Sequence, residues 1–417
     1  MKYIRDISRY LVGIVFIFSG FVKGIDPLGS TYKFSDYFTA FHMGFLDPIA
    51  LPLAFILSAI EFIIGFNLFL GIRMKLTSWL TLIFMSFFTI LTFILALTNP
   101  VTDCGCFGDA LILTNWQTFA KNIVLLLLTL IIFNQRNRFR LYLPVKIEWG
   151  TLLIALAGFV LLESYSYRHL PVIDFRPYHI GADIQSGMKI PEGAPKDEYQ
   201  TFLFYKKNGE VKQFTMDNYP WDDSTWTWVD TKSILVKKGY VPPIHDFSIV
   251  TWDNSNITNH VLNDKGYSFL FISHNLKKAN KKAFDMADQL SAWSEDHDNV
   301  SFYPLTASTG MDIKVFKATH PVDYNFYTTD ETTLKTIIRA NPGLVLIKDG
   351  VILQKWSYND FPSLDELGRN LLSSAITHQQ KTHEKLVYLL FFAGVFLYML
   401  LIKALFRRNK DTYNQHV

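Results

Sequence analysis

Long apolar stretches constrain this chain more than any other feature of its sequence. A helix that crosses the apolar core of a bilayer needs about 20 residues. Six stretches approach that length: residues 10–22, 49–70, 76–97, 117–133, 149–162 and 386–406. Only 18% of the 417 residues are charged, and 49% are hydrophobic. We therefore predict a polytopic α-helical membrane protein with six spans, rather than a soluble globular fold.

The distribution of Lys and Arg predicts the orientation of these spans, because cytoplasmic connections carry an excess of basic residues. With the N-terminus inside, the cytoplasmic segments contain thirteen basic residues: Lys2, Arg5, Arg9, Arg73, Lys75, Arg136, Arg138, Arg140, Lys146, Lys403, Arg407, Arg408 and Lys410. The short outer loops contain only Lys23 and Lys33. We predict a bacterial inner-membrane protein with both termini cytoplasmic and a large periplasmic domain. Residues 19–23 offer no signal-peptide cleavage pattern, so the first span is expected to remain as an anchor.

The composition changes along the chain predict five regions. Residues 1–140 contain four spans with short connections, which is typical of a four-helix membrane bundle. A fifth span at 149–162 leads to a small β-rich region, 169–240, in which Asn208-Gly209 favours a type I′ hairpin turn. Residues 241–376 alternate strands (267–272, 300–305, 344–347, 351–356) with helices (276–293, 332–339), as in an α/β domain. A last span at 386–406 follows. No basic stripe indicates nucleic-acid binding.

The only two cysteines lie in the outer loop before the fourth span, in the segment Asp103-Cys104-Gly105-Cys106-Phe107-Gly108-Asp109. Two thiols on the oxidising side of a membrane indicate a dithiol–disulfide couple, and Gly105 widens the backbone choices of this closely spaced pair. Nearby Asp103 and Asp109 would raise the thiol pKa values. A structural disulfide remains the alternative. A metal site would need more ligands, and His42 is the only histidine nearby, so no metal is predicted.

Two polar residues interrupt the second span, Glu61 and Asn67. An ionisable side chain at that depth costs about 2.5 to 3.5 kcal/mol on insertion scales, and so marks a candidate functional site. The alternative is a structural hydrogen bond to another helix, for example to Ser19. Lys23 and Lys121 are interpreted as helix-end lysines whose ammonium groups extend to the membrane surface.

The N-terminal region resembles the DoxX and MauE group of four-helix membrane proteins over about residues 1–140. The resemblance is carried by residues 19–23 with Asp26-Pro27, by Glu61 with Gly65, and most specifically by the cysteine segment 103–109. That group is associated with quinone-linked or disulfide-related redox work in the cell envelope. The resemblance therefore implies a redox or maturation role; the cofactor stays open, with a quinone as the candidate.

The outer α/β domain resembles a thioredoxin-like fold. Asn341-Pro342 stands where that fold places its cis-proline, before a strand. The position of the usual Cys-x-x-Cys reads Ser273-His274-Asn275-Leu276. Without sulfur this domain cannot exchange disulfides, so we expect it to bind a partner or to act as a scaffold. His274 is either a ligand or a solvated loop histidine.

Three functional hypotheses follow. The leading one is a membrane thiol–disulfide oxidoreductase or maturation factor that uses Cys104 and Cys106, with a quinone near Glu61 and an envelope protein as client. The second is a non-enzymatic envelope assembly or scaffold protein with a static cysteine bridge. The third is transport of a small molecule through the bundle.

Overall fold

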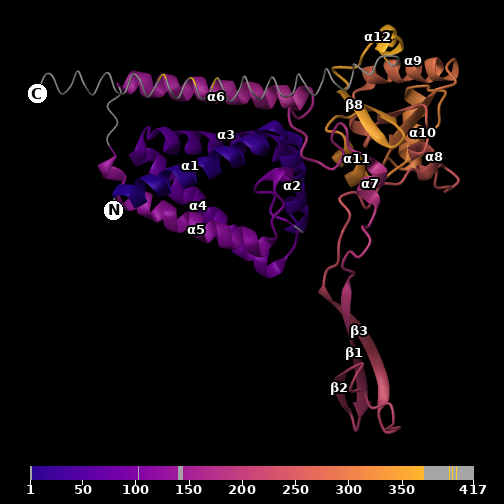
Figure 1. Ribbon diagram of the computed structural model, residues 1–417, viewed down its shortest axis with the longest axis horizontal. Helices are drawn as coiled ribbons and strands as arrows, with labels where there is room; N and C mark the ends of the chain where they lie inside the picture. Colours follow the sequence, from indigo (N-terminus) through magenta and orange to yellow (C-terminus); the bar gives the residue numbers. More distant parts are fainter. Residues whose placement is uncertain are drawn as a thin grey trace, which may run out of the picture. The chain divides into compact units, whose positions relative to one another are not determined.

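The computed structural model describes residues 2–101, 103–139 and 144–370, together with Gly394, Leu397 and Leu401. The chain forms two compact units, one made of Met1–Ala182 with Ser248–Val417 and the other of Asp183–Phe247. The first unit contains a set of long helices and an α/β domain, and the second contains a small antiparallel sheet (Figure 1).

Five helices in the described part of the chain are long and apolar enough to cross a membrane. They are α1 (Lys2–Ile25), α3 (Ala50–Leu70), α4 (Met74–Thr98), α5 (Asn115–Asn134) and α6 (Val145–Arg168). At a rise of about 1.5 Å per residue, 20 residues span about 30 Å. The predicted spans at 10–22 and 149–162 are too short, since both helices contain 24 residues. The predicted span at 386–406 lies outside the described residues, apart from three single positions.

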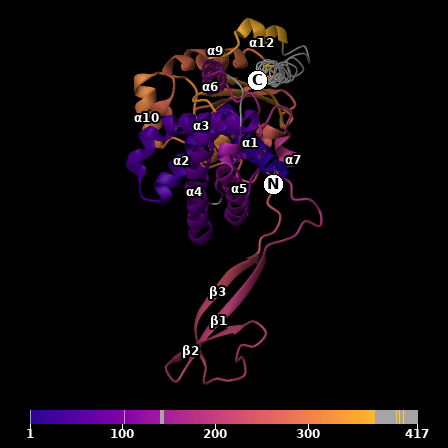
Figure 2. The same cartoon turned by 90° about the vertical axis from the view of Figure 1, so that its left-hand side faces the viewer.

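The helices α1, α3, α4 and α5 lie side by side (Figures 1 and 2). Glycines let α1 approach α3 closely. A Cβ atom added to Gly20 would lie 2.6 Å from the backbone nitrogen of Phe62, and one added to Gly65 would lie 2.5 Å from that of Ile17. Small residues commonly permit such contacts between membrane helices. The fifth long helix, α6, stacks Phe159 on Phe62 with ring centroids 4.3 Å apart.

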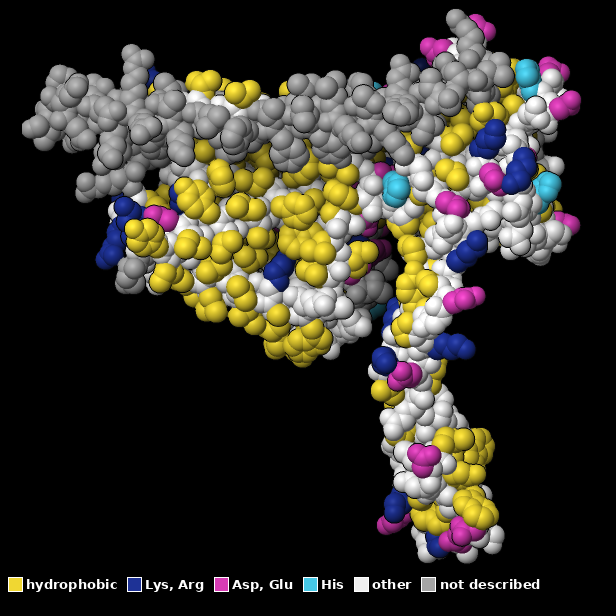
Figure 3. Space-filling model, in the orientation of Figure 1, with side chains coloured by type: hydrophobic (Ala, Val, Ile, Leu, Met, Phe, Trp, Pro, Cys, Tyr) yellow, Lys and Arg dark blue, Asp and Glu magenta, His cyan; other side chains and the backbone are white. Residues whose placement is uncertain are grey.

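The outward faces of these helices are apolar, as a lipid environment requires. Figure 3 shows hydrophobic side chains gathered over the helical region. Many of them are large and exposed, including Ile56, Ile83, Phe87, Ile90, Leu127 and Leu161. Most charged residues of the same region lie at helix ends or in internal pairs such as Arg73 with Glu148, whose nitrogen and oxygen are 3.0 Å apart.

A short helix, α2 (Pro27–Ala40), forms in the segment that the sequence interpretation treated as an outer loop. Its N-terminus follows directly after α1. The side chain of Asp26 accepts a hydrogen bond from the backbone N–H of Gly29 at 2.9 Å, and Pro27 occupies the first helical turn. Both features are typical of a helix start. A 3₁₀ turn at Gly44–Ile49 then connects α2 to α3.

The α/β domain contains a five-stranded sheet in the order β6-β5-β4-β7-β8. Its strands are β4 (Tyr267–Ile272), β5 (Val300–Thr306), β6 (Tyr327–Thr328), β7 (Gly343–Lys348) and β8 (Val351–Ser357). The first three are parallel, whereas β7 and β8 run antiparallel to their neighbours. The Asn341–Pro342 peptide before β7 is cis. This strand order and the cis-proline are those of a thioredoxin-like fold, as the sequence predicts.

Helices pack against this sheet. The helices of the domain are α8 (Thr258–Leu262), α9 (Phe284–Glu295), α10 (Gly310–Thr319), α11 (Glu331–Ile337) and α12 (Leu364–Asn370). One core cluster joins Phe269 and Leu346 of the sheet to Leu290 of α9 and Phe316 of α10. The helix predicted at 276–293 begins only at Phe284, because Asn275 and Asn280 cap two 3₁₀ turns that precede it. The sequence interpretation did not include α10 or β6.

The second unit contains a short helix, α7 (Ile184–Met188), and a three-stranded antiparallel sheet in the order β2-β1-β3. Its strands are β1 (Glu198–Lys207), β2 (Glu210–Thr215) and β3 (Thr227–Lys237). Asn208 and Gly209 join β1 to β2 with φ values of 53° and 91°. Two positive φ angles are the requirement of a type I′ turn, so the predicted hairpin is confirmed.

Candidate functional site

The two cysteines lie in the loop between α4 and α5, with their Sγ atoms 2.9 Å apart. Both are free thiols. The backbone at Gly105 has a φ of 63° and that at Gly108 a φ of 51°, a region that residues with a Cβ rarely adopt. These two glycines therefore allow the loop to turn back on itself, so that both sulfur atoms face the same cavity.

A polar chain from α1 and α3 supports the inner side of this loop. Ser19 Oγ lies 2.8 Å from Glu61 Oε2 and 2.8 Å from the carbonyl oxygen of Cys106. Lys23 Nζ donates to both carboxylate oxygens of Glu61, at 2.6 and 2.8 Å, and to Ser19 Oγ at 3.1 Å. The structure thus brings Ser19 and Glu61 together in a hydrogen bond, which was the alternative interpretation of Glu61. Through Ser19, the same pair also contacts the backbone of Cys106.

One interpretation of the polar membrane residues was wrong. Lys23 does not extend to the membrane surface, because its side chain is buried in the ion pair with Glu61. Asn67, the other polar candidate of the second span, lies almost two helical turns beyond Glu61 along α3. Its Oδ1 atom is buried there and has no hydrogen-bond partner among the described residues.

The outer side of the loop is held by α2. The hydroxyl of Tyr37 donates to the carbonyl oxygen of Cys104 at 2.7 Å. Lys33 forms an ion pair with Asp103 at 2.7 Å, and the other oxygen of Asp103 accepts the backbone N–H of Gly105 at 2.9 Å. Sequence interpretation missed Tyr37 and Lys33 because it did not recognise α2, although the Asp26-Pro27 pair is a helix-start signal that would have found it.

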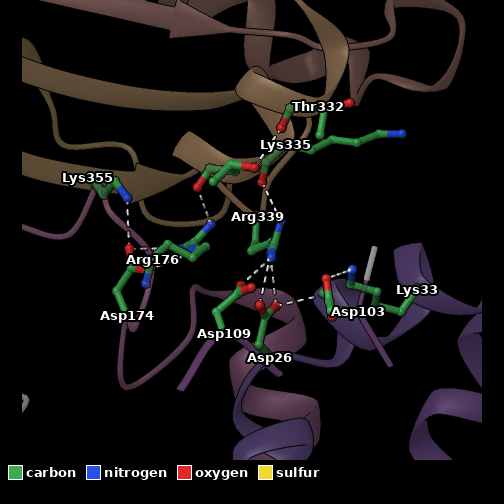
Figure 4. A network of polar contacts seen from close by, with 12 residues as sticks. Asp26, Lys33, Asp103, Asp109, Asp174, Arg176, Thr332, Lys335, Arg339 and Lys355 are labelled. Atoms are coloured by element: carbon green, nitrogen blue, oxygen red, sulfur yellow. Dashed lines mark hydrogen bonds and ion pairs between the residues drawn. The ribbon is translucent and has the colours of Figure 1, made fainter. Parts of the chain in front are cut away.

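The α/β domain also contacts the loop, through Arg339 (Figure 4). Its guanidinium donates to Asp26 at 2.9 Å and to Asp109 at 3.1 Å. The two aspartates next to the thiols are therefore paired with cations, Asp103 with Lys33 and Asp109 with Arg339. The increase in thiol pKa that unpaired aspartates would cause is correspondingly reduced.

The site that corresponds to a thioredoxin active site faces α2. The imidazole ring of His274 lies edge-on to Tyr32, with ring centroids 6.5 Å apart, and its Nδ1 is 3.9 Å from Glu331. Burial lowers the pKa of His274 to about 4, so the ring is neutral at pH 7 and does not form a true ion pair. His274 is thus a buried interface residue and not a solvated loop histidine. Pro342, the other residue predicted for this site, forms a cis peptide bond with Asn341.

The surroundings distinguish the two thiols. The hydrogen bond between the two sulfur atoms, together with the ammonium groups of Lys121 and Lys23, holds the pKa of Cys106 below that of an ordinary thiol. The same hydrogen bond and its burial raise the pKa of Cys104. Cys106 is therefore the thiol that loses its proton more readily, and the thiolate is the reactive form of cysteine.

A cavity of about 270 Å³ opens beside the thiols. Most of its wall is apolar and aromatic, with Phe16, Phe34, Phe38, Phe41, Phe84, Phe87, Phe88 and Phe107 among the lining residues. Its few polar groups include Lys23, Glu61, Lys121 and Asn122. A second cavity of about 220 Å³ lies outside the loop and is lined by charged residues of both domains. Ser30, Lys33 and Gly105 line both cavities.

Within the described ranges, no group of three or more His, Cys, Asp or Glu side chains is arranged to hold a metal ion. The thiol pair, two lysines and an apolar cavity instead form a set suited to two-electron exchange at sulfur.

Comparisons with known proteins agree with this division of the chain. Residues 1–134 match the family described as methylamine utilisation protein MauE. Residues 199–238 match a domain of unknown function, DUF8463. No curated protein sequence matches the chain.

Two solved structures resemble the region of the α/β domain. One is a candidate protein disulfide isomerase from Bacteroides thetaiotaomicron, at 13% identity, covering 34% of this chain and 90% of that one, with a TM-score of 0.25. The other is BsSco, a member of the Sco family of cytochrome c oxidase assembly proteins, at 13% identity, covering 31% and 91%, with a TM-score of 0.26. The fold assignment rests on strand order rather than on these similarities. The chain therefore combines a MauE-like helical membrane region with an α/β domain of thioredoxin-like fold.

Proposed function

We propose that this protein is a thiol–disulfide oxidoreductase of the cell envelope. Cys104 and Cys106 would transfer two electrons between the thiols of an envelope protein client and a hydrophobic carrier of the quinone class. The observation that supports this most strongly is the position of the thiol pair. The only two sulfhydryl groups of the chain line one apolar cavity, next to two lysine ammonium groups.

The exchange balances without any further reactant. When the pair is a disulfide, a client dithiol reduces it and becomes a disulfide itself. The two electrons then reside on Cys104 and Cys106, as two thiols. Transfer of these electrons to a quinone restores the disulfide, and the two thiol protons go with the electrons to give the quinol.

The residues around the cavity fit a quinone. Phenylalanine side chains offer flat apolar surfaces for a ring, and the side chain of Lys121 offers N–H donors for one of its carbonyl oxygens. Glu61 neutralises Lys23 and keeps its ammonium group in place at 2.6 Å.

We place this site at the periplasmic face of a bacterial inner membrane. The basic residues Arg5, Arg9, Arg73 and Arg136 lie at the ends of α1, α3, α4 and α5 away from the cysteine loop, which supports a cytoplasmic position for those ends. The cysteine loop then lies on the oxidising side, where thiol–disulfide couples operate.

Trapping of the client tests this proposal. The variant Cys104→Ser keeps Cys106, the thiol whose pKa is lowered, and removes the thiol that would resolve a mixed disulfide. We expect it to accumulate a mixed disulfide with an envelope protein on non-reducing gels, more than Cys106→Ser does. The double variant, Cys104→Ser with Cys106→Ser, is the matched control and should trap nothing.

The cavity is tested separately. Reduced full-length protein in lipid nanodiscs should lose two thiols per chain when a short-chain ubiquinone is added, and the double serine variant should not consume quinone. If both single variants trap nothing and support normal growth, and if the quinone leaves the thiols reduced, the pair is a static bridge. The protein would then be an assembly factor or a scaffold.

A further inference from the structure

The α/β domain has no cysteine, yet one of its side chains is part of the structure that holds the cysteine loop. Arg339 lies just after α11 and before the cis-proline peptide. Its side chain is only 7% exposed. Its Nε lies 2.9 and 3.1 Å from the two oxygens of Asp26, Nη2 donates to Asp109 at 3.1 Å, and Nη1 donates to the carbonyl oxygen of Lys335 at 2.6 Å.

The two carboxylates that bind Arg339 are those of Asp26 and Asp109. One lies at the junction of α1 and α2, and the other lies at the end of the cysteine loop. Asp26 joins α1, which carries Ser19 and Lys23, to α2, which carries Tyr37 and Lys33. Asp109 lies three residues after Cys106. The guanidinium of Arg339 therefore connects the end of the cysteine loop to the junction of α1 and α2 (Figure 4). Side chains of these two helices form hydrogen bonds with the loop.

The packing around Arg339 leaves little freedom for another arrangement. Its Cζ lies 5.3 Å from the centre of the Tyr32 ring, and its Nη2 would lie 3.0 Å from a Cβ atom added to Gly29. A buried guanidinium needs all of its charge and N–H groups compensated. The two carboxylates and the backbone carbonyl provide that compensation in this one position.

We propose that Arg339 is a positioning residue for the Cys104–Cys106 pair, and that the thioredoxin-like domain serves as the part of the protein that completes this site. The inference rests on the proposed function, and it gives the cysteine-free domain a defined task. By holding Asp109 against Asp26, Arg339 keeps Cys106 between Ser19 and Lys121 and keeps the loop closed on its outer side.

A pair of charge-removing substitutions distinguishes positioning from a direct effect of charge. Arg339→Gln removes a cation, and Asp109→Asn removes an anion on the same bridge. Through-space electrostatics predicts opposite changes in the pKa of Cys106. Positioning predicts the same change for both variants, because either one releases the loop from the lysines.

The measurement is the rate of alkylation of Cys106 against pH in the reduced full-length chain in nanodiscs, with the Cys106 peptide identified by mass spectrometry. Both Arg339→Gln and Asp109→Asn should move the midpoint upward from that of the parent, toward the ordinary thiol value of about 8.5. The combined variant should shift no further than either single one, because both break one bridge.

Lys355→Gln is the matched control. Lys355 is another buried cation of the same domain, bonded to Asp174 at 2.8 Å, whereas Arg339 binds Asp26 and Asp109. It should leave the midpoint unchanged. If Arg339→Gln does not accumulate, Arg339→Lys replaces it, since a lysine keeps the charge but cannot span both aspartates; it should show the same upward shift.

Opposite shifts for the two single variants, or an unchanged midpoint in both, would overturn the positioning role. Alkylation requires no electron carrier and no client. A shifted midpoint together with a failure to trap a client would therefore leave Arg339 as a positioning residue while the proposed redox function fails.

Discussion

A buried ion pair lies at the centre of the site at the scale of single residues. The side chains of Lys23 and Glu61 are 9% and 5% exposed, and their closest atoms are 2.6 Å apart. Desolvation offsets much of the attraction within such a pair, so the pair itself adds little to stability. Removal of one partner is costly, however, because it leaves an uncompensated charge among apolar side chains. This asymmetry explains how two charged residues are tolerated inside the helices.

The pair is expected to behave as one unit in a double-mutant cycle. Glu61→Gln should destabilise the protein by about 3–5 kcal/mol, because Lys23 remains charged and unpaired. The double variant with Lys23→Met should recover most of that loss. Thermal unfolding of the purified protein in detergent measures both effects. Equal and additive losses for the two single substitutions would show that the residues do not interact.

The two thiols should also differ in their reactivity with pH. A lowered pKa means that Cys106 becomes a thiolate at a lower pH than an ordinary thiol does. Alkylation of Cys106 in the reduced protein should therefore rise and reach its plateau at a lower pH than that of an ordinary thiol, whose pKa is about 8.5. Cys104, whose pKa is raised, should react only in alkaline solution. Mass spectrometry of the alkylated peptides identifies each site, and a common midpoint for both thiols would contradict this assignment.

At the scale of secondary structure elements, the close contact of α1 with α3 brings Ser19 and Lys23 to Glu61. The glycine at position 20 allows the two backbones to approach, since a Cβ atom added there would lie only 2.6 Å from the backbone nitrogen of Phe62. Helices that carry a larger residue there would have to separate, and the polar chain beneath Cys106 would separate with them.

Substitution of Gly20 is expected to lower the stability of the protein and the reactivity of the thiol pair together. Gly20→Ala should destabilise the protein by about 1–3 kcal/mol, the usual cost of overpacking, and should slow quinone-dependent loss of the thiols. Gly158→Ala in α6 is the matched control, because nothing lies within 4 Å of its added Cβ. Thermal unfolding and the thiol assay should leave that control close to the parent protein. Equal effects of the two substitutions would argue against a specific contact at Gly20.

The sequence predicted the elements whose signals are local. Apolar length located the five described long helices, the Asn208-Gly209 pair located a hairpin, and Asn341-Pro342 marked the start of β7. Helix α2 was missed because its residues mix aromatic, polar and charged types, with no clear apolar period. Arg339 was missed for a different reason. Its partners Asp26 and Asp109 lie 313 and 230 residues away along the chain, and no pattern in a single sequence reveals such pairs.

At the scale of the whole chain, the order of the helices and the contacts of Arg339 point to the same side of the membrane. The cysteine loop follows α4, and α2 follows α1, so both lie at the same end of the helices. The fifth long helix starts at the opposite end and leads to the α/β domain. An odd number of crossings before residue 168 therefore places that domain on the side of the cysteine loop, where Arg339 meets Asp109.

Reporter fusions test this topology. Alkaline phosphatase folds only where disulfides form, so a fusion after residue 240 should be active, and a fusion at residue 142, between α5 and α6, should be inactive. A cytoplasmic reporter such as β-galactosidase should give the reverse pattern at the same two positions. The physical reason is the thirteen-to-two excess of basic residues in the connections assigned to the cytoplasm. Activity of alkaline phosphatase at residue 142 and inactivity after residue 240 would place the thiol pair in the reducing compartment and would remove the basis of the proposed disulfide chemistry.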